Sequence, residues 1–99
     1  MIVEFVNKFK KDFKRAPDEI QDRVLDIIKT LENAENINSL QIDIKRMEGQ
    51  KKGESYYRIR VGDWRIGCEI LQPNILLLRL MSRGDVYKHF PPKWEKTLV

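Results

Sequence analysis

Three arginines flank a short turn in the middle of the chain, and their spacing suggests chemistry more directly than any other feature. Two runs of β-forming residues lie on either side of Gly62-Asp63, a dipeptide that suits a two-residue hairpin turn. In that register Arg60 lies directly opposite Arg65, and Arg58 shares their face. Like charges facing each other destabilise a sheet, by about 0.2–1 kcal/mol on the scale of cross-strand pairs. A sequence that accepts this conflict predicts a polyanion bound on that face.

The same face is predicted to gather further groups that suit a nucleic acid. Arginine binds phosphate well because its planar fork forms paired hydrogen bonds and stays charged near neutral pH. Aromatic neighbours stack on unpaired bases, which contributes about 1–3 kcal/mol per base. Single-stranded RNA is the ligand that this combination suits best. The candidates are Arg58, Arg60, Arg65 and Arg83 for phosphate, with Lys51, Lys52, Tyr56, Tyr87 and His89 beside them.

The residues available point to a reaction that needs neither a metal ion nor a cofactor. The sequence has one histidine, no carboxylate pair with metal-ligand spacing and no glycine-rich phosphate loop. RNA carries its own nucleophile, the 2′-OH, so cleavage requires a proton acceptor, a proton donor and cations that stabilise the phosphorane. Tyr87, Lys51, Lys52 and His89 are the candidate proton carriers, since surrounding positive charge lowers the pKa of a tyrosine or lysine. The sequence leaves open which of them acts.

The composition indicates one domain over residues 1–99, with a single hydrophobic core. Nineteen Lys and Arg against fifteen Asp and Glu give a net charge of +4. That charge alone is a weak argument for nucleic acid, but basic residues concentrate in segment 8–15 and after residue 57. The single cysteine, Cys68, excludes an internal disulfide and a Cys-based zinc site. We expect no signal peptide, no membrane span and a cytoplasmic protein.

The N-terminal third predicts a strand followed by a pair of helices. Segment 2–6 predicts the strand, and segment 7–15 a short helix that is capped by Asn7 and buries Phe9 and Phe13. Pro17 suits the first position of a second helix. The apolar residues of that helix recur as one continuous stripe: Ile20, Val24, Ile27, Ile28 and Leu31. The two helices are therefore expected to form an αα-hairpin.

The rest of the chain predicts an antiparallel β-meander, so the fold class is α+β: an N-terminal strand and an αα-hairpin packed on the meander. Segment 42–47 is a short strand or a connection, and segment 48–54 is a polar loop. Segments 56–61, 64–70 and 75–83 are the meander strands. Arg79 is interpreted as a salt-bridge partner of Glu69, and a last short helix is expected after Pro91-Pro92. The face predicted to contact the helices comprises Tyr57, Ile59, Val61, Trp64, Ile66, Cys68 and Ile70.

This pattern resembles the RelE/ParE superfamily of type II toxins, which have a microbial-RNase-like fold. The resemblance covers essentially the whole chain and rests on the element order and two motifs, Tyr-Arg-Ile-Arg-Val-Gly-Asp-Trp-Arg-Ile-Gly at 57–67 and Arg-Gly-Asp-Val-Tyr at 83–87. It implies an mRNA interferase of the RelE branch, which cuts mRNA in the ribosome and is neutralised by a cognate antitoxin in a hetero-oligomer. Two alternatives are kept: a ParE-like inhibitor of DNA gyrase without nuclease activity, and a non-catalytic RNA-binding module.

Matched by motif, the resemblance implies roles for individual residues. It assigns phosphate binding and transition-state stabilisation to Arg58, Arg60, Arg65 and Arg83, and acid–base chemistry or base stacking to Tyr87. Two positions depart from the family's pattern. Many relatives have a histidine where this chain has Ser82, and RelE proteins favour lysines at the positions of Arg58 and Arg60. Both departures concern proton transfer and leave phosphate binding intact.

Overall fold

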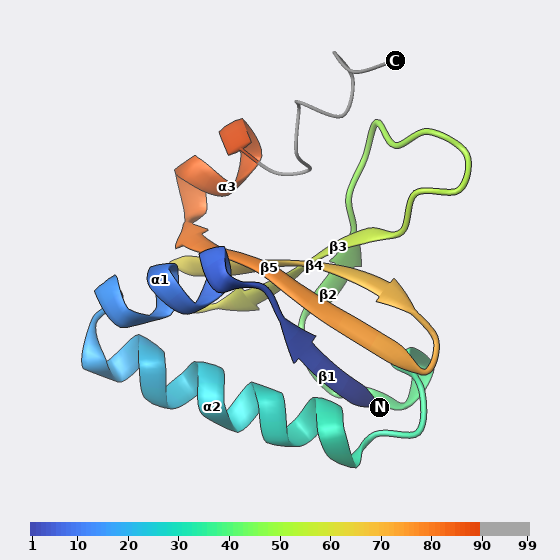
Figure 1. Ribbon diagram of the computed structural model, residues 1–99, viewed down its shortest axis with the longest axis horizontal. Coiled ribbons are helices and arrows are strands. Elements are labelled where there is room, and N and C mark those ends of the chain that lie inside the picture. Colours follow the sequence, from blue (N-terminus) through green and yellow to red (C-terminus); the bar gives the residue numbers. More distant parts are fainter. Residues whose placement is uncertain (90–99) are drawn as a thin grey trace.

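The predicted meander forms the centre of a five-stranded mixed sheet in the order β1-β5-β4-β3-β2 (Figure 1). The computed structural model describes residues 1–89, except for the side chains of Tyr87 and His89. Neighbouring strands pair antiparallel from β2 to β5, whereas β1 pairs parallel with β5. The strands are β1 (Ile2–Phe5), β2 (Ile44–Arg46), β3 (Tyr56–Val61), β4 (Trp64–Leu71) and β5 (Asn74–Ser82).

Two helices, α1 (Asn7–Arg15) and α2 (Asp18–Asn33), form the predicted hairpin and pack on one side of the sheet (Figure 1). Val24 and Leu31 of α2 are fully buried in the same cluster as Ile59 and Ile66 of the sheet. Burying a side chain of this size stabilises the fold by about 1.5–3 kcal/mol relative to exposure. The predicted stripe on α2 is therefore confirmed as a core face. A short 3₁₀ helix, Ile37–Ser39, follows α2.

Both helices begin one residue away from their predicted starts. Asn7 is the first residue of α1 and does not cap it, because Val6 occupies the cap position without a side-chain hydrogen bond. Pro17 precedes α2, where its carbonyl accepts the N–H groups of Ile20 and Gln21 at 2.9 and 3.0 Å. The side chain of Gln21 also donates to the carbonyl of Phe13 at 2.8 Å, which satisfies the end of α1. Backbone groups at this junction are thus paired without the predicted cap.

The β3–β4 turn has the predicted register, with Val61 opposite Trp64. Gly62 has a φ of +59° and Asp63 does not have a positive φ, which fits a type II′ turn with glycine at the first central position. The turn lies against α2, since a Cβ at Gly62 would come within 3.0 Å of Nη1 of Arg23. This position therefore requires glycine for its backbone angle, whereas an added Cβ would only have to displace the end of the half-exposed Arg23 side chain.

Replacing Gly62 with alanine is expected to lower the free energy of unfolding by about 1–2 kcal/mol, because an L side chain is strained at this φ. Urea denaturation measures the change. Gly84→Ala is the matched control, since an added Cβ there meets nothing within 4 Å. Gly84 lies in a helix, where alanine is favoured over glycine. If Gly62→Ala and Gly84→Ala lower the free energy of unfolding equally, the turn does not require glycine.

A third helix, α3 (Arg83–His89), packs on the opposite side of the sheet from the helical hairpin (Figure 1). Its Val86 is fully buried in a second apolar cluster with Met47, Tyr56 and Met81. The prediction of a final strand that ends at Arg83 is wrong, because β5 ends at Ser82 and Arg83 opens α3. The short helix expected after Pro91-Pro92 lies outside the described residues.

An ion pair at the edge of β5 differs from the predicted one. Nε of Arg79 donates to Oδ2 of Asp12 on α1 at 2.8 Å, so Glu69 is not its partner. The same carboxylate oxygen accepts the backbone N–H of Leu80 at 3.0 Å. β1 pairs with β5 only as far as Leu77, so beyond that point α1 supplies the acceptor that a neighbouring strand would have supplied.

Candidate functional site

Strand pairing brings the predicted arginines together on the sheet face that also carries α3. Arg60 lies directly opposite Arg65, and Arg58 lies opposite Gly67. Side chains opposite each other in a ladder share a face, so the predicted juxtaposition is confirmed. The edge strand adds Lys45, which is exposed and pairs with Arg58. Sequence reasoning missed Lys45 because only the pairing of β2 with β3 places it on this face.

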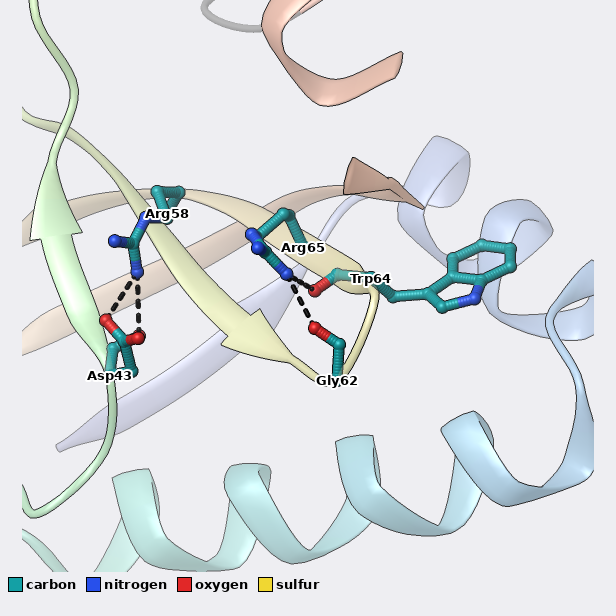
Figure 2. A network of polar contacts seen from close by, with 5 residues as sticks. All are labelled: Asp43, Arg58, Gly62, Trp64 and Arg65. Atoms are coloured by element: carbon teal, nitrogen blue, oxygen red, sulfur yellow. Dashed lines mark hydrogen bonds and ion pairs between the residues drawn. The ribbon is translucent and has the colours of Figure 1, made fainter. Parts of the chain in front are cut away.

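Arg65 is buried, contrary to the expectation of an open arginine patch. Its residue is 7% exposed, and its Nη1 donates to the carbonyls of Gly62 and Trp64 at 2.7 and 2.9 Å (Figure 2). Its Nε is buried without a hydrogen-bond partner in the described part of the chain. A buried charge that lacks an opposite charge is costly. The site therefore holds a positive charge that a bound anion would stabilise.

Arg58 forms an ion pair that the sequence did not predict. Its Nη1 donates to Oδ1 of Asp43 at 2.6 Å and to the carbonyl of Asp43 at 3.3 Å (Figure 2). The hydrogen bond from Arg58, together with the positive charges of Arg58, Arg60 and Arg65, lowers the pKa of Asp43, against a smaller opposing effect of burial. Asp43 is therefore the anion of this arginine cluster, and it carries its charge at neutral pH.

The structure describes the positions of three of the other predicted site residues, Arg83, Lys51 and Lys52. Arg83 is exposed at the start of α3, and its backbone N–H donates to the carbonyl of Asp63 in the β3–β4 turn at 2.8 Å. Lys51 and Lys52 are exposed in the loop between β2 and β3. The backbones of Tyr87 and His89 lie in α3, but their side chains are outside the described part, so their roles stay predictions.

Tyr56 does not present an open stacking surface in this structure. It is 5% exposed and packs with Met47, Met81 and Val86 between the sheet and α3. The expectation that Tyr56 stacks on RNA bases therefore has no structural support. Cys68 is fully buried as predicted, and burial raises the pKa of its thiol well above its usual range. It is a core residue.

Two features of the described residues bear on the class of site. Over residues 1–89, excluding the undescribed side chains, no three His, Cys, Asp or Glu residues are grouped so that they could hold a metal ion. Within the same described range, no helix has the length and apolar character needed to cross a bilayer. The chemistry that the described face offers is that of clustered guanidinium groups.

A helical hairpin on one face of the sheet and an arginine cluster on the other define the class of small toxins with the RelE/ParE fold. The family described as the ParE toxin of type II toxin–antitoxin system, parDE, matches residues 3–87. The chain is also 40% identical over 91 residues to Toxin RelE3 of Methanocaldococcus jannaschii, covering 92% of this chain and 100% of that one. This protein therefore belongs to the ParE toxin family of the RelE/ParE superfamily and is a toxin of a type II toxin–antitoxin system.

Solved structures agree with this assignment. The toxin of the RelB–RelE antitoxin–toxin complex from Methanococcus jannaschii superposes with a TM-score of 0.73 at 36% identity, covering 89% of this chain and 99% of that one. A chain of the archaeal RelE–RelB complex from Pyrococcus horikoshii OT3 gives a TM-score of 0.66 at 26% identity, covering 84% and 94%. The predicted α+β class is confirmed.

Proposed function

We propose that this toxin is an endoribonuclease that cleaves mRNA in the cytoplasm, at the ribosome, and so inhibits translation. The observation that carries the proposal is the buried guanidinium of Arg65, which is bonded only to carbonyl oxygens among the described residues. Directly opposite it, Arg60 is exposed. A phosphate beside Arg60 would also meet the positive charge of Arg65, which is already desolvated and held in position by the hairpin.

The reaction that suits these groups is transfer of the phosphate to the neighbouring 2′-OH. The 2′-oxygen bonds to phosphorus and the bond from phosphorus to the 5′-oxygen breaks, leaving a 2′,3′-cyclic phosphate and a 5′-OH. One group takes the 2′-OH proton and another protonates the departing 5′-oxygen. Arg58, Arg60, Arg65 and Arg83 would hold the phosphate and stabilise the additional negative charge of the phosphorane. Tyr87, His89, Lys51 and Lys52 are our candidates for moving the protons.

We further propose that a cognate antitoxin binds this chain in a hetero-oligomer and covers the arginine face. Two relatives were solved as complexes of RelE with the antitoxin RelB. An antitoxin that carries acidic side chains would compete with phosphate for the same guanidinium groups, because both present oxygen anions.

A second function is kept because the matching family is described as the ParE toxin. In that reading the arginine face binds a protein, DNA gyrase is inhibited and no RNA is cleaved. The reading differs from the first in a measurable way, since it requires no proton carrier and predicts intact mRNA.

Primer extension on mRNA incubated with purified toxin, with and without translating ribosomes, tests the proposal. We expect cuts at defined codon positions, with 5′-OH ends downstream and cyclic phosphate ends upstream. Excess EDTA, added to the reaction without ribosomes because ribosomes themselves need Mg²⁺, should leave any cuts there unchanged. Intact mRNA together with breaks in gyrase-bound DNA would overturn the nuclease and favour the ParE-like function.

A further inference from the structure

The arginine cluster contains one anion of its own, and its position suggests a role in ligand binding. Asp43 precedes β2 and contacts Arg58 through its carboxylate at 2.6 Å. The charge of Arg58 is thus balanced before any ligand arrives. Arg60 and Arg65 have no ion pair among the described residues. The three arginines are therefore not equivalent toward an incoming phosphate.

The backbone holds Asp43 in place beside the cluster. Its carbonyl accepts the backbone N–H of Arg60 at 2.9 Å, which continues the β2–β3 ladder by one residue. The Asp43 side chain is 50% exposed, whereas that of Arg58 is 16% exposed. The carboxylate thus lies on the solvent side of the pair, where a phosphate would approach Arg58.

We propose that Asp43 is an internal substitute for an RNA phosphate, which RNA must displace from Arg58 in order to bind. The inference rests on the proposed function in taking RNA as the ligand. A carboxylate oxygen and a phosphate oxygen accept the same charge-assisted hydrogen bond from a guanidinium, so only one of them can hold Nη1 in this geometry. The displaced carboxylate also repels the phosphate. Asp43 therefore weakens binding and favours ligands that bring several phosphates to the arginines together.

The test measures affinity for a single-stranded RNA oligonucleotide with 2′-O-methyl groups, which cannot be cleaved through the 2′-OH. Fluorescence anisotropy of the labelled RNA compares the unaltered toxin with Asp43→Asn, an isosteric change. We expect binding to become about tenfold tighter at low salt, because the competing charge is removed. We also expect the plot of log affinity against log salt to steepen by as much as about 0.7, the value for one phosphate contact on a single strand.

Two controls separate this role from a general effect of charge. Asp22→Asn changes the net charge equally but alters an exposed residue of α2, which packs on the other face of the sheet. We expect at most about a twofold effect there, since separated surface charges are screened. In an Arg58→Gln background, Asp43→Asn should bring a clearly smaller gain, because only the repulsion between carboxylate and phosphate remains once the arginine that both anions contact is gone.

The outcomes separate failure of this inference from failure of the proposed function. If the unaltered toxin does not bind the free RNA, this inference is overturned, whereas the proposed function is overturned by intact mRNA in the primer-extension experiment. If it binds RNA and Asp43→Asn binds no tighter than Asp22→Asn, or gains equally without Arg58, the inference alone is overturned. Thermal melting checks the fold of each variant, and Asp43→Ser provides a second removal of the charge if the asparagine variant does not fold. The inference is also overturned if Asp43→Asn leaves the affinity for RNA unchanged but slows single-turnover cleavage of ordinary RNA. Asp43 would then take part in the reaction and not in binding.

Discussion

Replacing Arg65 with alanine is expected to lower the single-turnover rate of RNA cleavage by about 100- to 1,000-fold, the usual effect of removing one preorganised group that stabilises transition-state charge. The physical reason is the burial of its guanidinium, which is 7% exposed and bonded to two carbonyls of the hairpin. Such a charge is already desolvated and fixed, so it needs no reorganisation when the phosphorane forms. The measurement is the cleavage rate at saturating toxin, below the melting temperature of the variant.

The control for this prediction is Arg46→Ala, which removes the same charge from another sheet arginine that also donates to a carbonyl. Arg46 pairs with Tyr57, so it lies on the sheet face opposite to Arg65. Arg65→Lys should recover only part of the rate. Nη1 alone donates to both carbonyls, so an ammonium in its place would leave no second nitrogen for the paired hydrogen bonds that a guanidinium forms with phosphate. If Arg65→Ala folds and cleaves as fast as Arg46→Ala, the catalytic role of Arg65 is excluded.

Replacing Asp12 with alanine is expected to lower the free energy of unfolding by about 2–4 kcal/mol. Its carboxylate accepts both Nε of Arg79, at 2.8 Å, and the backbone N–H of Leu80, at 3.0 Å. The two side chains of the ion pair are only 20% and 13% exposed, so their removal from water is already largely complete. The substitution leaves an arginine and a strand N–H without their acceptor, and both losses are costly in a partly buried setting. Urea denaturation measures the change.

The comparison variant is Glu19→Ala, because Glu19 forms an ion pair with Arg23 at 3.5 Å on the exposed side of α2. That pair is open to solvent, so its loss should cost at most about 0.5 kcal/mol. A double-mutant cycle with Arg79→Ala should show coupling between Asp12 and Arg79. A loss for Asp12→Ala as small as that for Glu19→Ala would show that α1 does not depend on this anchor.

Several parts of the fold could be predicted from the sequence because neighbouring residues determine them. Alternation around Gly62-Asp63 predicted the β3–β4 register, and the apolar stripe of segment 20–31 predicted the buried side of α2. The neighbour of β1 could not be predicted in this way. It pairs with β5, about seventy positions further along the chain, and no local pattern specifies a parallel partner at that separation.

In the candidate site too, local patterns predicted some features, and contacts between distant segments set the others. Sequence alternation correctly placed Arg60 opposite Arg65 on the face away from the helical hairpin. It did not show that Arg65 is buried or that Tyr56 lies beneath α3, because burial depends on which element packs over a face. It also assigned Arg79 to Glu69, where the structure has Asp12.

The order of residues along a strand or helix dictates which residue types share a face, because alternation in a strand and periodicity in a helix follow from backbone geometry. Alternation therefore predicted an arginine cluster, and two motifs of the sequence resembled a known toxin family. Which charges in the cluster are balanced depends instead on tertiary packing. Asp43 reaches Arg58 from the segment that precedes β2, and Arg65 donates to carbonyls of its own hairpin. These pairings follow from how distant segments pack together, because a side chain bonds to whatever partner the fold brings within hydrogen-bonding distance.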